Sequence, residues 1–274
     1  MKYEEKVQKL NMQMRRFARQ DIAVAFSGGA DSSLLLKLAV DAAAVFGSNV
    51  YGILMHTMLH PAGEAEEART LAEKIGAKFC MVSVDELQGA GILDNPADRC
   101  YRCKKYLFEQ LLRECSILGV SVVLEGTNGD DLHVYRPGLR AVRELGILSP
   151  LADAEFTKAE VRKLGAKLGI SASEKPASPC LATRFPYGTR LSSEAMRKVE
   201  QGERFIREKG FYNVRLRVHG DLVRIEVDIE EFQEFMKERE AVTACLKALG
   251  YRYITLDLEG FRSGSMDISL SHTR

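Results

Sequence analysis

Residues 22–33, IAVAFSGGADSS, place a short apolar run directly before a turn of glycine and serine, and a run of leucines follows. The apolar run predicts a buried strand, and the leucine spacing predicts a helix. Gly28 and Gly29 let the backbone turn tightly and direct its N–H groups at an anion, while Ser27 and Ser32 add hydroxyl donors. The stretch therefore predicts a phosphate-binding loop between a strand and a helix. It is not a Walker A loop, because the GxxxxGKS/T pattern is missing and the loop carries no lysine.

The pattern of this stretch continues along the chain and predicts an α/β fold. Apolar strand-like runs alternate with helical segments, and the runs lie at residues 22–26, 50–55, 78–84 and 120–126. Continuous Val, Ile and Leu runs of this kind are typical of a parallel sheet covered on both faces. The helix expected at residues 157–169 opens with a capping box, in which Thr157 precedes Glu160 by three positions.

A proline-rich segment at residues 171–193 predicts a junction between two domains. Beyond it the expected order is helix (192–209), strand (213–218), turn, strand (222–227), helix (229–248) and strand (252–258). This order predicts a small α+β domain. We therefore expect a nucleotide-binding domain over residues 1–180 and a smaller α+β substrate-binding domain over residues 181–274.

The composition predicts an ordinary cytoplasmic protein. The chain has 274 residues, 28% charged residues and a net charge of +1, so its bulk charge does not predict a nucleic-acid-coating surface. No apolar run approaches the roughly 18 residues of a membrane span. The charged N-terminal segment lacks the apolar core of a secretory signal. In the cytosol the six cysteines are expected to be thiols or metal ligands rather than disulfides.

The SGGxDS pattern after the first strand resembles that of the PP-loop ATP pyrophosphatase superfamily. The resemblance implies that ATP is cleaved between its α- and β-phosphates, so that a carbonyl or carboxyl oxygen is adenylylated and AMP is then displaced. Such chemistry requires positioning and charge neutralisation. Asp31 is placed to hold a Mg²⁺ that bridges the phosphates, although a single carboxylate can also simply cap a helix.

Three of the six cysteines stand out by their surroundings. Cys100 and Cys103 form a CxxC within RCYRCKK, and Cys180 follows the proline-rich segment. Each is expected in a loop or at the boundary of an element, beside cations that lower a thiol pKa. The other three are expected to be buried thiols within a strand or helices: Cys80, Cys115 and Cys245. A lone CxxC is compatible with zinc, a redox pair or simple packing, whereas three thiolates leave one iron of a [4Fe-4S] cluster without a protein ligand.

Five colinear blocks, spread from about residue 20 to 268, resemble the LarE family of PP-loop sulfur transferases. The blocks are NPADRCYRCKKYLF, EGTNGDDLHVYRPGLRA, KPASPCLATRFPYGT, VRLRVHGDLVRIEV and LDLEGFRSGSMD. The resemblance implies that the carboxylates of pyridinium-3,5-biscarboxylic acid mononucleotide are converted into thiocarboxylates, a step in the biosynthesis of the nickel-pincer nucleotide cofactor.

The family has two ways to deliver sulfur, and both remain open here. In one, a single cysteine at the position of Cys180 gives up its own sulfur and becomes dehydroalanine. In the other, three cysteines bind a [4Fe-4S] cluster that delivers sulfide repeatedly. Because this chain carries Cys100, Cys103 and Cys180, we expect the cluster form, with sacrificial donation by Cys180 as the alternative.

Further polar residues in the blocks are expected to complete the site. Glu125 ends the fourth predicted strand, where open α/β sheets place ligands, although it can also cap the following loop. Arg215 and Arg262 are candidates for the substrate phosphate because a guanidinium contacts an anion in two places, and Arg184 is expected in the same patch. Glu203 precedes them on a helix and is either part of the site or a solvated residue.

Other functions are compatible with parts of the pattern. A PP-loop enzyme that thiolates tRNA would need a basic face, an ammonia-dependent amide synthetase would need no clustered cysteines, and a regulatory ATP-binding module would bind nucleotide without turnover. The resemblance further implies a homo-oligomer, a small-molecule substrate and an external sulfide or sulfur donor. It implies no nucleic-acid partner and no membrane partner.

Overall fold

The computed structural model describes residues 1–59, 63–134, 136–174, 180–262 and 265–266, which form two compact units. The first unit contains Met1–Thr57, Ala62–Gly91 and Asp98–Ser178, and the second contains Met58–Pro61, Ile92–Ala97 and Pro179–Arg274. Each unit is described by itself. No helix in the described part of the chain is both long enough and apolar enough to cross a bilayer.

The first unit is built on a parallel sheet, as the apolar runs predicted. Its strands lie in the order β3-β2-β1-β4, and all neighbouring pairs are parallel. Their bounds are Ile22–Ala25 (β1), Val50–His56 (β2), Lys78–Ser83 (β3) and Val122–Leu124 (β4). Because β1 is followed by β2 on one side and is flanked by β4 on the other, the sheet has a topological switch point between β1 and β4.

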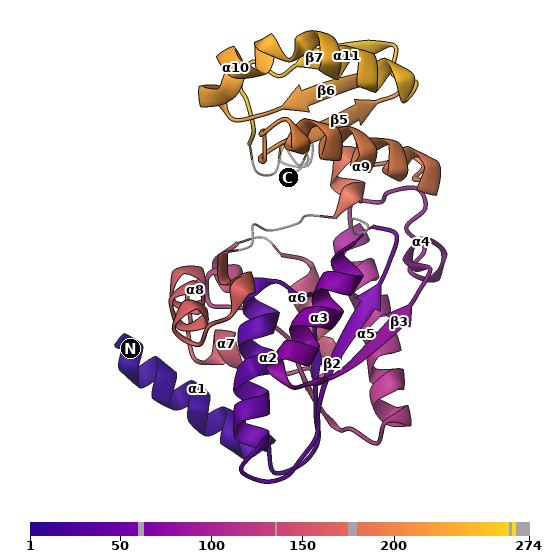
Figure 1. The fold of residues 1–274 in the computed structure, drawn as a ribbon. Coiled ribbons are helices and arrows are strands. Elements are labelled where there is room, and N and C mark those ends of the chain that lie inside the picture. The colour runs from indigo at the N-terminus through magenta and orange to yellow at the C-terminus, as the bar shows by residue number, and fades with distance from the viewer. Residues whose placement is uncertain (60–62, 135, 175–179, 263–264, 267–274) are drawn as a thin grey trace. The chain divides into compact units, whose positions relative to one another are not determined.

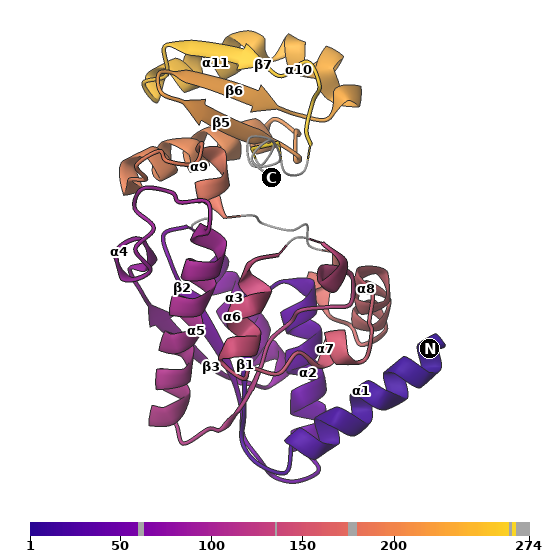
Figure 2. The same cartoon turned by 180° about the vertical axis from the view of Figure 1, so that it is seen from behind.

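Helices cover both faces of this sheet (Figures 1 and 2). Ile22 and Val24 of β1 face one hydrophobic cluster, and Ala23 between them faces the other, as the alternation of a strand requires. The first cluster is completed by helices α1 (Tyr3–Phe17), α2 (Ala30–Ala43), α3 (Glu64–Ile75) and α8 (Lys158–Lys167). The second is completed by α5 (Arg99–Ile117) and α6 (Gly138–Glu144). The shorter elements are α4 (Glu86–Gly89), η1 (Asp130–His133), α7 (Pro150–Asp153) and η2 (Ser171–Glu174).

Helix α5 begins earlier than the sequence indicated. The apolar spacing of residues 104–119 predicts a helix that begins at Lys104, but α5 starts at Arg99 and includes RCYRC in its first turns. The Asp98 carboxylate precedes it and accepts a hydrogen bond from Nε of Arg102 at 2.8 Å, an i,i+4 ion pair that continues helical geometry through the basic segment.

The second unit has the α+β order that was predicted. Its sheet has the order β5-β6-β7, with β5 and β6 antiparallel and β6 and β7 parallel. The elements are η3 (Leu181–Arg184), α9 (Ser193–Glu208), β5 (Arg215–His219), β6 (Leu222–Glu226), η4 (Ile229–Glu231), α10 (Phe232–Lys237), α11 (Arg239–Ala248) and β7 (Tyr253–Leu256). The prediction of a single helix over residues 229–248 is wrong, because the helix is interrupted at Glu238. No proline or glycine marks this break, and Glu238 instead pairs with Lys209 at 2.9 Å.

Two short pieces of chain from the N-terminal half belong to the second unit. The carbonyl of Leu59 accepts a hydrogen bond from Leu181 N at 3.0 Å, and the carbonyl of Leu93 accepts one from Leu191 N at 2.7 Å. The Asn95 amide donates to the carbonyl of Phe185 at 3.1 Å. The boundary predicted at residue 180 would assign both pieces to the first domain. Only tertiary contacts place them in the second unit.

The capping box of α8 is confirmed, and it leads to a stability prediction. The Thr157 hydroxyl accepts a hydrogen bond from Glu160 N at 3.2 Å, and the Glu160 carboxylate accepts one from Thr157 N at 2.8 Å. We expect Thr157→Ala to lower the free energy of unfolding by about 1 kcal/mol, because the cap is lost. Urea unfolding followed by circular dichroism measures the change. Thr70→Ala, at an exposed position inside α3, is the matched control and is expected to leave stability unchanged or slightly raised.

Candidate functional site

The glycine–serine loop lies at the switch point of the parallel sheet. It follows β1, while the EGTN segment (125–128) follows the neighbouring strand β4, so both occupy the carboxyl edge of the sheet. The two approach each other closely: a Cβ on Gly126 would lie 3.1 Å from both Cβ of Asp31 and N of Ser32. Any larger residue at position 126 would have to displace the loop.

Hydrogen bonds within the loop hold its anion-binding shape. Ser27 N donates to Oγ of Ser32 at 3.3 Å, and the Ser32 hydroxyl donates to the carbonyl of Gly29 at 3.2 Å. Gly28 has a φ of +72°, a left-handed conformation that favours glycine. Helix α2 begins at Ala30, directly after Gly29, so its N-terminal N–H groups and dipole lie at the loop. The residues present therefore fit the phosphates of a nucleotide.

Asp31 in the first turn of α2 has two partners from distant parts of the first unit. Its Oδ1 accepts a hydrogen bond from Nδ2 of Asn128 at 3.2 Å, and its Oδ2 forms an ion pair with Nζ of Lys158. Lys158 is the first residue of α8, and its backbone N–H donates to Asp130 at 2.8 Å. One carboxylate beside a phosphate loop fits a Mg²⁺ ion that takes its other ligands from phosphates and water.

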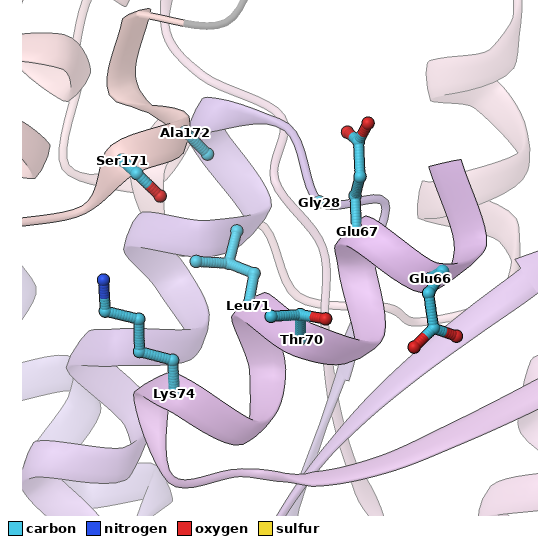
Figure 3. Close-up of a pocket in the computed structure, with 8 residues that line it drawn as sticks. All are labelled: Gly28, Glu66, Glu67, Thr70, Leu71, Lys74, Ser171 and Ala172. Carbon is cyan, nitrogen blue, oxygen red and sulfur yellow. The ribbon is translucent and has the colours of Figure 1, made fainter. Parts of the chain in front are cut away.

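A cavity of about 650 Å³ lies beside the loop, between α3 and η2 (Figure 3). Gly28 forms one wall, and α3 and η2 supply the others through Glu66, Glu67, Thr70, Leu71, Lys74, Ser171 and Ala172. Its volume lies within the range of about 300–1,000 Å³ that small-molecule sites occupy. The space next to the phosphate loop is therefore large enough for the rest of a nucleotide.

The CxxC lies in the first unit, at the start of α5. Cys100 is exposed and Cys103 is half-buried. They are three residues apart on one helix, so they lie on the same side of its first turn. Two thiols so arranged can serve as a pair of metal ligands.

Lys104 links the CxxC helix to the end of β4. Its Nζ lies 3.6 Å from Oε2 of Glu125 and 4.4 Å from the ring centre of Phe108. The Glu125 side chain is only 3% exposed, and its Oε1 accepts hydrogen bonds from Thr127 N at 3.0 Å and from the Ser149 hydroxyl. Glu125 thus caps the EGTN loop and faces α5, the helix that carries the CxxC. This geometry suits both the capping role and the role in the site that the sequence suggested.

The three remaining thiols have environments that disfavour the thiolate. Burial raises the pKa of Cys80, of Cys245 and of Cys115, the last to about 11. Cys115 is buried as expected, whereas Cys80 and Cys245 are half-buried.

Cys180 lies in the second unit, directly before η3, and is half-buried. Its carbonyl accepts hydrogen bonds from the Thr183 hydroxyl at 2.8 Å and from Nη1 of Arg184 at 3.2 Å. Arg184 is 2% exposed and forms two hydrogen bonds with Glu203, at 2.8 and 2.9 Å. The solvated alternative for Glu203 is wrong, since its side chain is 1% exposed and lies inside this pair. Burial opposes its ionisation and is the largest single influence. The hydrogen bonds and the charge of Arg184, together with the Leu216 N–H and the charge of Arg207, nevertheless lower the pKa of Glu203.

Arg215 offers a half-buried guanidinium suited to an anion. It stacks on the Phe261 ring at 5.0 Å and donates to the carbonyl of Val214 at 2.7 Å. Among the residues that the structure describes, no carboxylate lies within ion-pair distance of it. Burial, followed by the charge of Arg184, lowers its pKa to about 10. Arg262 differs, because it pairs with Glu259 at 2.7 Å and lies 3.8 Å from Asp257.

Each unit of the structure contains one group of the predicted site residues. The first unit holds the loop with Ser27, Gly28, Gly29, Asp31 and Ser32, together with Glu125, Cys100 and Cys103. The second holds Cys180, Arg184, Arg215 and Arg262. No three or more potential metal-ligating side chains cluster among the described residues. A site built from all three cysteines therefore stays a prediction.

Sequence reasoning missed Lys158 and the contact of Lys104 with Glu125. Lys158 meets Asp31 across 127 positions of chain, for which no local pattern exists. The sequence did contain a signal for Lys104, which lies four positions after Cys100. In a helix that begins at Arg99 the two residues lie on the same side.

Comparison with known proteins identifies relatives along most of the chain. Residues 2–133 match the family model described as a PP-loop domain. Pyridinium-3,5-bisthiocarboxylic acid mononucleotide synthase of Lactiplantibacillus plantarum is 39% identical over 253 residues, which cover 92% of this chain and 91% of that protein. An uncharacterised protein of Synechocystis sp. is 38% identical, over 89% of this chain and 91% of its own length. A tRNA-specific 2-thiouridylase of Geobacter metallireducens is 31% identical, over 59% of this chain and 54% of its length.

The ion pair at the loop leads to a binding prediction. Without Lys158, the Asp31 carboxylate would repel incoming phosphates, so we expect Lys158→Met to weaken ATP binding in the absence of Mg²⁺ by about tenfold. The loss is expected to be smaller with Mg²⁺, because the metal also neutralises Asp31. Isothermal titration with ATP, in EDTA and in Mg²⁺, measures both.

Lys167→Met is the matched control, because Lys167 is an exposed lysine of the same helix. Its ATP affinity is expected to equal that of the unaltered chain. Equal ATP affinity of Lys158→Met and Lys167→Met in EDTA would contradict the prediction.

Proposed function

Because the chain belongs to the LarE family of PP-loop sulfur transferases, we propose that it is an ATP-dependent synthase of pyridinium-3,5-bisthiocarboxylic acid mononucleotide. The observation that carries this proposal is the 39% identity to that synthase over 92% of the chain. The phosphate loop at the switch point of the sheet, with Asp31 in the first helical turn, supplies a site for the ATP that the reaction consumes.

In the first step ATP activates a carboxylate. A substrate carboxylate oxygen attacks the α-phosphorus of ATP, the bond from that phosphorus to the oxygen bridging to the β-phosphate breaks, and pyrophosphate leaves. The N–H groups of the loop and the N-terminus of α2 stabilise negative charge on the phosphates. Asp31, whose carboxylate pairs with Lys158 in this structure, would hold a Mg²⁺ ion, which would supply further neutralisation of the phosphate charge.

In the second step sulfur replaces AMP. A sulfur nucleophile attacks the activated acyl carbon, the bond from that carbon to the AMP oxygen breaks, and a thiocarboxylate remains. Activation followed by displacement divides one hard substitution into two easier ones. Arg215 and Arg262 are the residues that we assign to the phosphate of the pyridinium mononucleotide, and Arg215 suits it best because it has no described carboxylate partner.

The source of the sulfur is the finer part of the proposal. We assign Cys100, Cys103 and Cys180 to a [4Fe-4S] cluster, which supplies a bound sulfide when present. Cys100 and Cys103 fit it as a pair on one helical turn, and Lys104 of the same helix connects this turn to Glu125. Sacrificial donation by Cys180 is the alternative. The cytoplasmic location, the homo-oligomer and the external sulfur donor stay predictions from the family resemblance.

A turnover experiment separates the two sulfur routes. The chain, purified and reconstituted without oxygen, is mixed with ATP, Mg²⁺ and the pyridinium dicarboxylate, and its intact mass is measured before and after turnover. We expect thiocarboxylate and AMP to form while the mass of the polypeptide stays unchanged. A loss equal to one H₂S per chain would instead establish donation by Cys180.

Cys100→Ala/Cys103→Ala is expected to abolish repeated turnover and the iron–sulfur absorption band. Cys80→Ala is the matched control, since Cys80 lies in β3 and its pKa is raised by burial. Adenylylation without any thiocarboxylate in the unaltered chain would contradict the proposed function itself.

A further inference from the structure

Helix α1 carries a buried lysine that the steps above do not use. Lys6 is 8% exposed, and its ammonium group contacts the start of α8. Nζ donates to the carbonyl of Glu155, 149 positions further along the chain, at 2.7 Å, and to the two carboxylate oxygens of Glu160 at 3.2 and 2.9 Å. One positive charge therefore joins α1 to two residues near the N-terminus of α8.

The two acceptors lie on either side of the first residue of α8. Glu160 closes the capping box with Thr157, and Glu155 has a φ of +57°, a left-handed conformation that residues other than glycine rarely adopt. Residues 155–158, which lead into the helix, we call the α8 entry turn. A left-handed residue persists where surrounding contacts hold it, and here Lys6 binds the carbonyl of that residue itself. Lys6 therefore fixes the α8 entry turn.

The α8 entry turn is also bonded to the end of the EGTN loop. Gly129 N donates to the carbonyl of Phe156 at 2.6 Å, and a Cβ on Gly129 would lie only 3.1 Å from that oxygen. Lys158 N donates to the Asp130 carboxylate at 2.8 Å. The Asn128 amide oxygen accepts a hydrogen bond from Asp130 N at 3.0 Å. The turn and this loop therefore share one hydrogen-bond network.

This network supplies both of the partners described above for Asp31. Lys158, at the end of the α8 entry turn, forms the ion pair with Oδ2, and Nδ2 of Asn128 donates to Oδ1 at 3.2 Å. A displacement of the turn would carry the backbone of Lys158 with it and draw the ammonium group away from the carboxylate. Lys6 is thus connected to the phosphate loop through Lys158.

Apolar packing already attaches α1 to the first unit. Leu10 and Met14 are buried in the first hydrophobic cluster, and the Tyr3 ring lies edge-on to the ring of Phe156 at 6.2 Å. An ammonium group loses hydration when it is buried, whereas a methionine of similar length would fill the space without that cost. The lysine adds a charged donor to a carbonyl and to a carboxylate, which methionine cannot supply. These contacts favour a role in placing the α8 entry turn.

We propose that Lys6 is a positioning residue for nucleotide binding, because it fixes the α8 entry turn so that Lys158 stays on Asp31. The inference rests on the proposed function in one respect, since the phosphate loop is taken to bind ATP. With the turn in place, Lys158 neutralises the Asp31 carboxylate, and the loop presents less negative charge to the phosphates. Loss of the Lys6 ammonium frees the turn and weakens that neutralisation.

A double-mutant cycle in the full-length chain tests the proposal. ATP affinity is measured by isothermal titration in EDTA for the unaltered chain, Lys6→Met, Lys158→Met and the double variant. We expect Lys6→Met to weaken binding about fivefold in the unaltered chain and to have no further effect in Lys158→Met, because the effect passes through the Lys158 side chain. With Mg²⁺ the loss is expected to be smaller, because the metal also neutralises Asp31.

Two further variants separate this effect from a loss of the fold. Lys6→Met/Glu160→Gln removes both charges and retains the capping box, since glutamine also serves at that position. It is expected to remain folded by circular dichroism and to show the same loss of ATP affinity. Lys163→Met is the matched control, because the exposed Lys163 also joins α8 to α1, with Nζ 4.4 Å from the centre of the Tyr3 ring. Its ATP affinity is expected to equal that of the unaltered chain.

A merely structural Lys6 would lower the melting temperature and leave ATP affinity in EDTA unchanged, and this result would overturn the proposal. A loss of equal size with and without the Lys158 side chain would overturn it as well, since Lys158 would then not carry the effect. Absence of ATP binding by the unaltered chain would contradict the proposed function together with this inference. Failure of thiocarboxylate synthesis by a chain that binds ATP would refute the proposed function alone.

Discussion

Parallel pairing of four apolar strands is the constraint on which the first unit depends. Parallel strands end at the same edge of a sheet, so the residues after β1 and the residues after β4 have to meet there. The contact is close enough that Gly126 lies against Asp31 and Ser32 without room for a side chain. The phosphate loop, the Asn128 amide and the Glu125 carboxylate are neighbours for this reason, although about a hundred residues separate them in the chain.

Charge compensation organises the polar parts of both units. Beside the loop, Asp31 would be an unfavourable neighbour for a phosphate, and Lys158 from α8 neutralises it. Near Glu125, Lys104 extends from α5, the helix that carries the CxxC, and connects it to the end of β4. The sequence indicated these two segments as separate parts of the site. In the second unit the compensation is internal, since each of Glu203 and Glu226 is shared by two guanidiniums. Burial makes such pairs costly to break, because removal of one partner leaves an unpaired charge.

Several elements could be predicted from local patterns, and their failures have identifiable causes. The strands of the first unit, the capping box of α8 and the α+β order of the second unit were predicted, since each depends on periodicity or spacing within a few residues. The start of α5 was placed too late because the basic residues around Cys100 and Cys103 lack apolar spacing. The break at Glu238 was missed because the segment contains only residues that helices accept. Glu203 was left open between site and solvent, and only its partners Arg184 and Leu216 decide that it is buried.

The sequence by itself determined the family and the phosphate loop, and it predicted a site of three cysteines, because all of these are carried by short motifs. Only the tertiary structure decided which charges compensate one another. The contacts of Lys158 with Asp31, of Lys104 with Glu125, of Arg184 with Glu203 and of Arg217 with Glu226 join side chains from different elements. Each depends on how helices and strands pack, and packing brings together residues that no spacing along the chain relates.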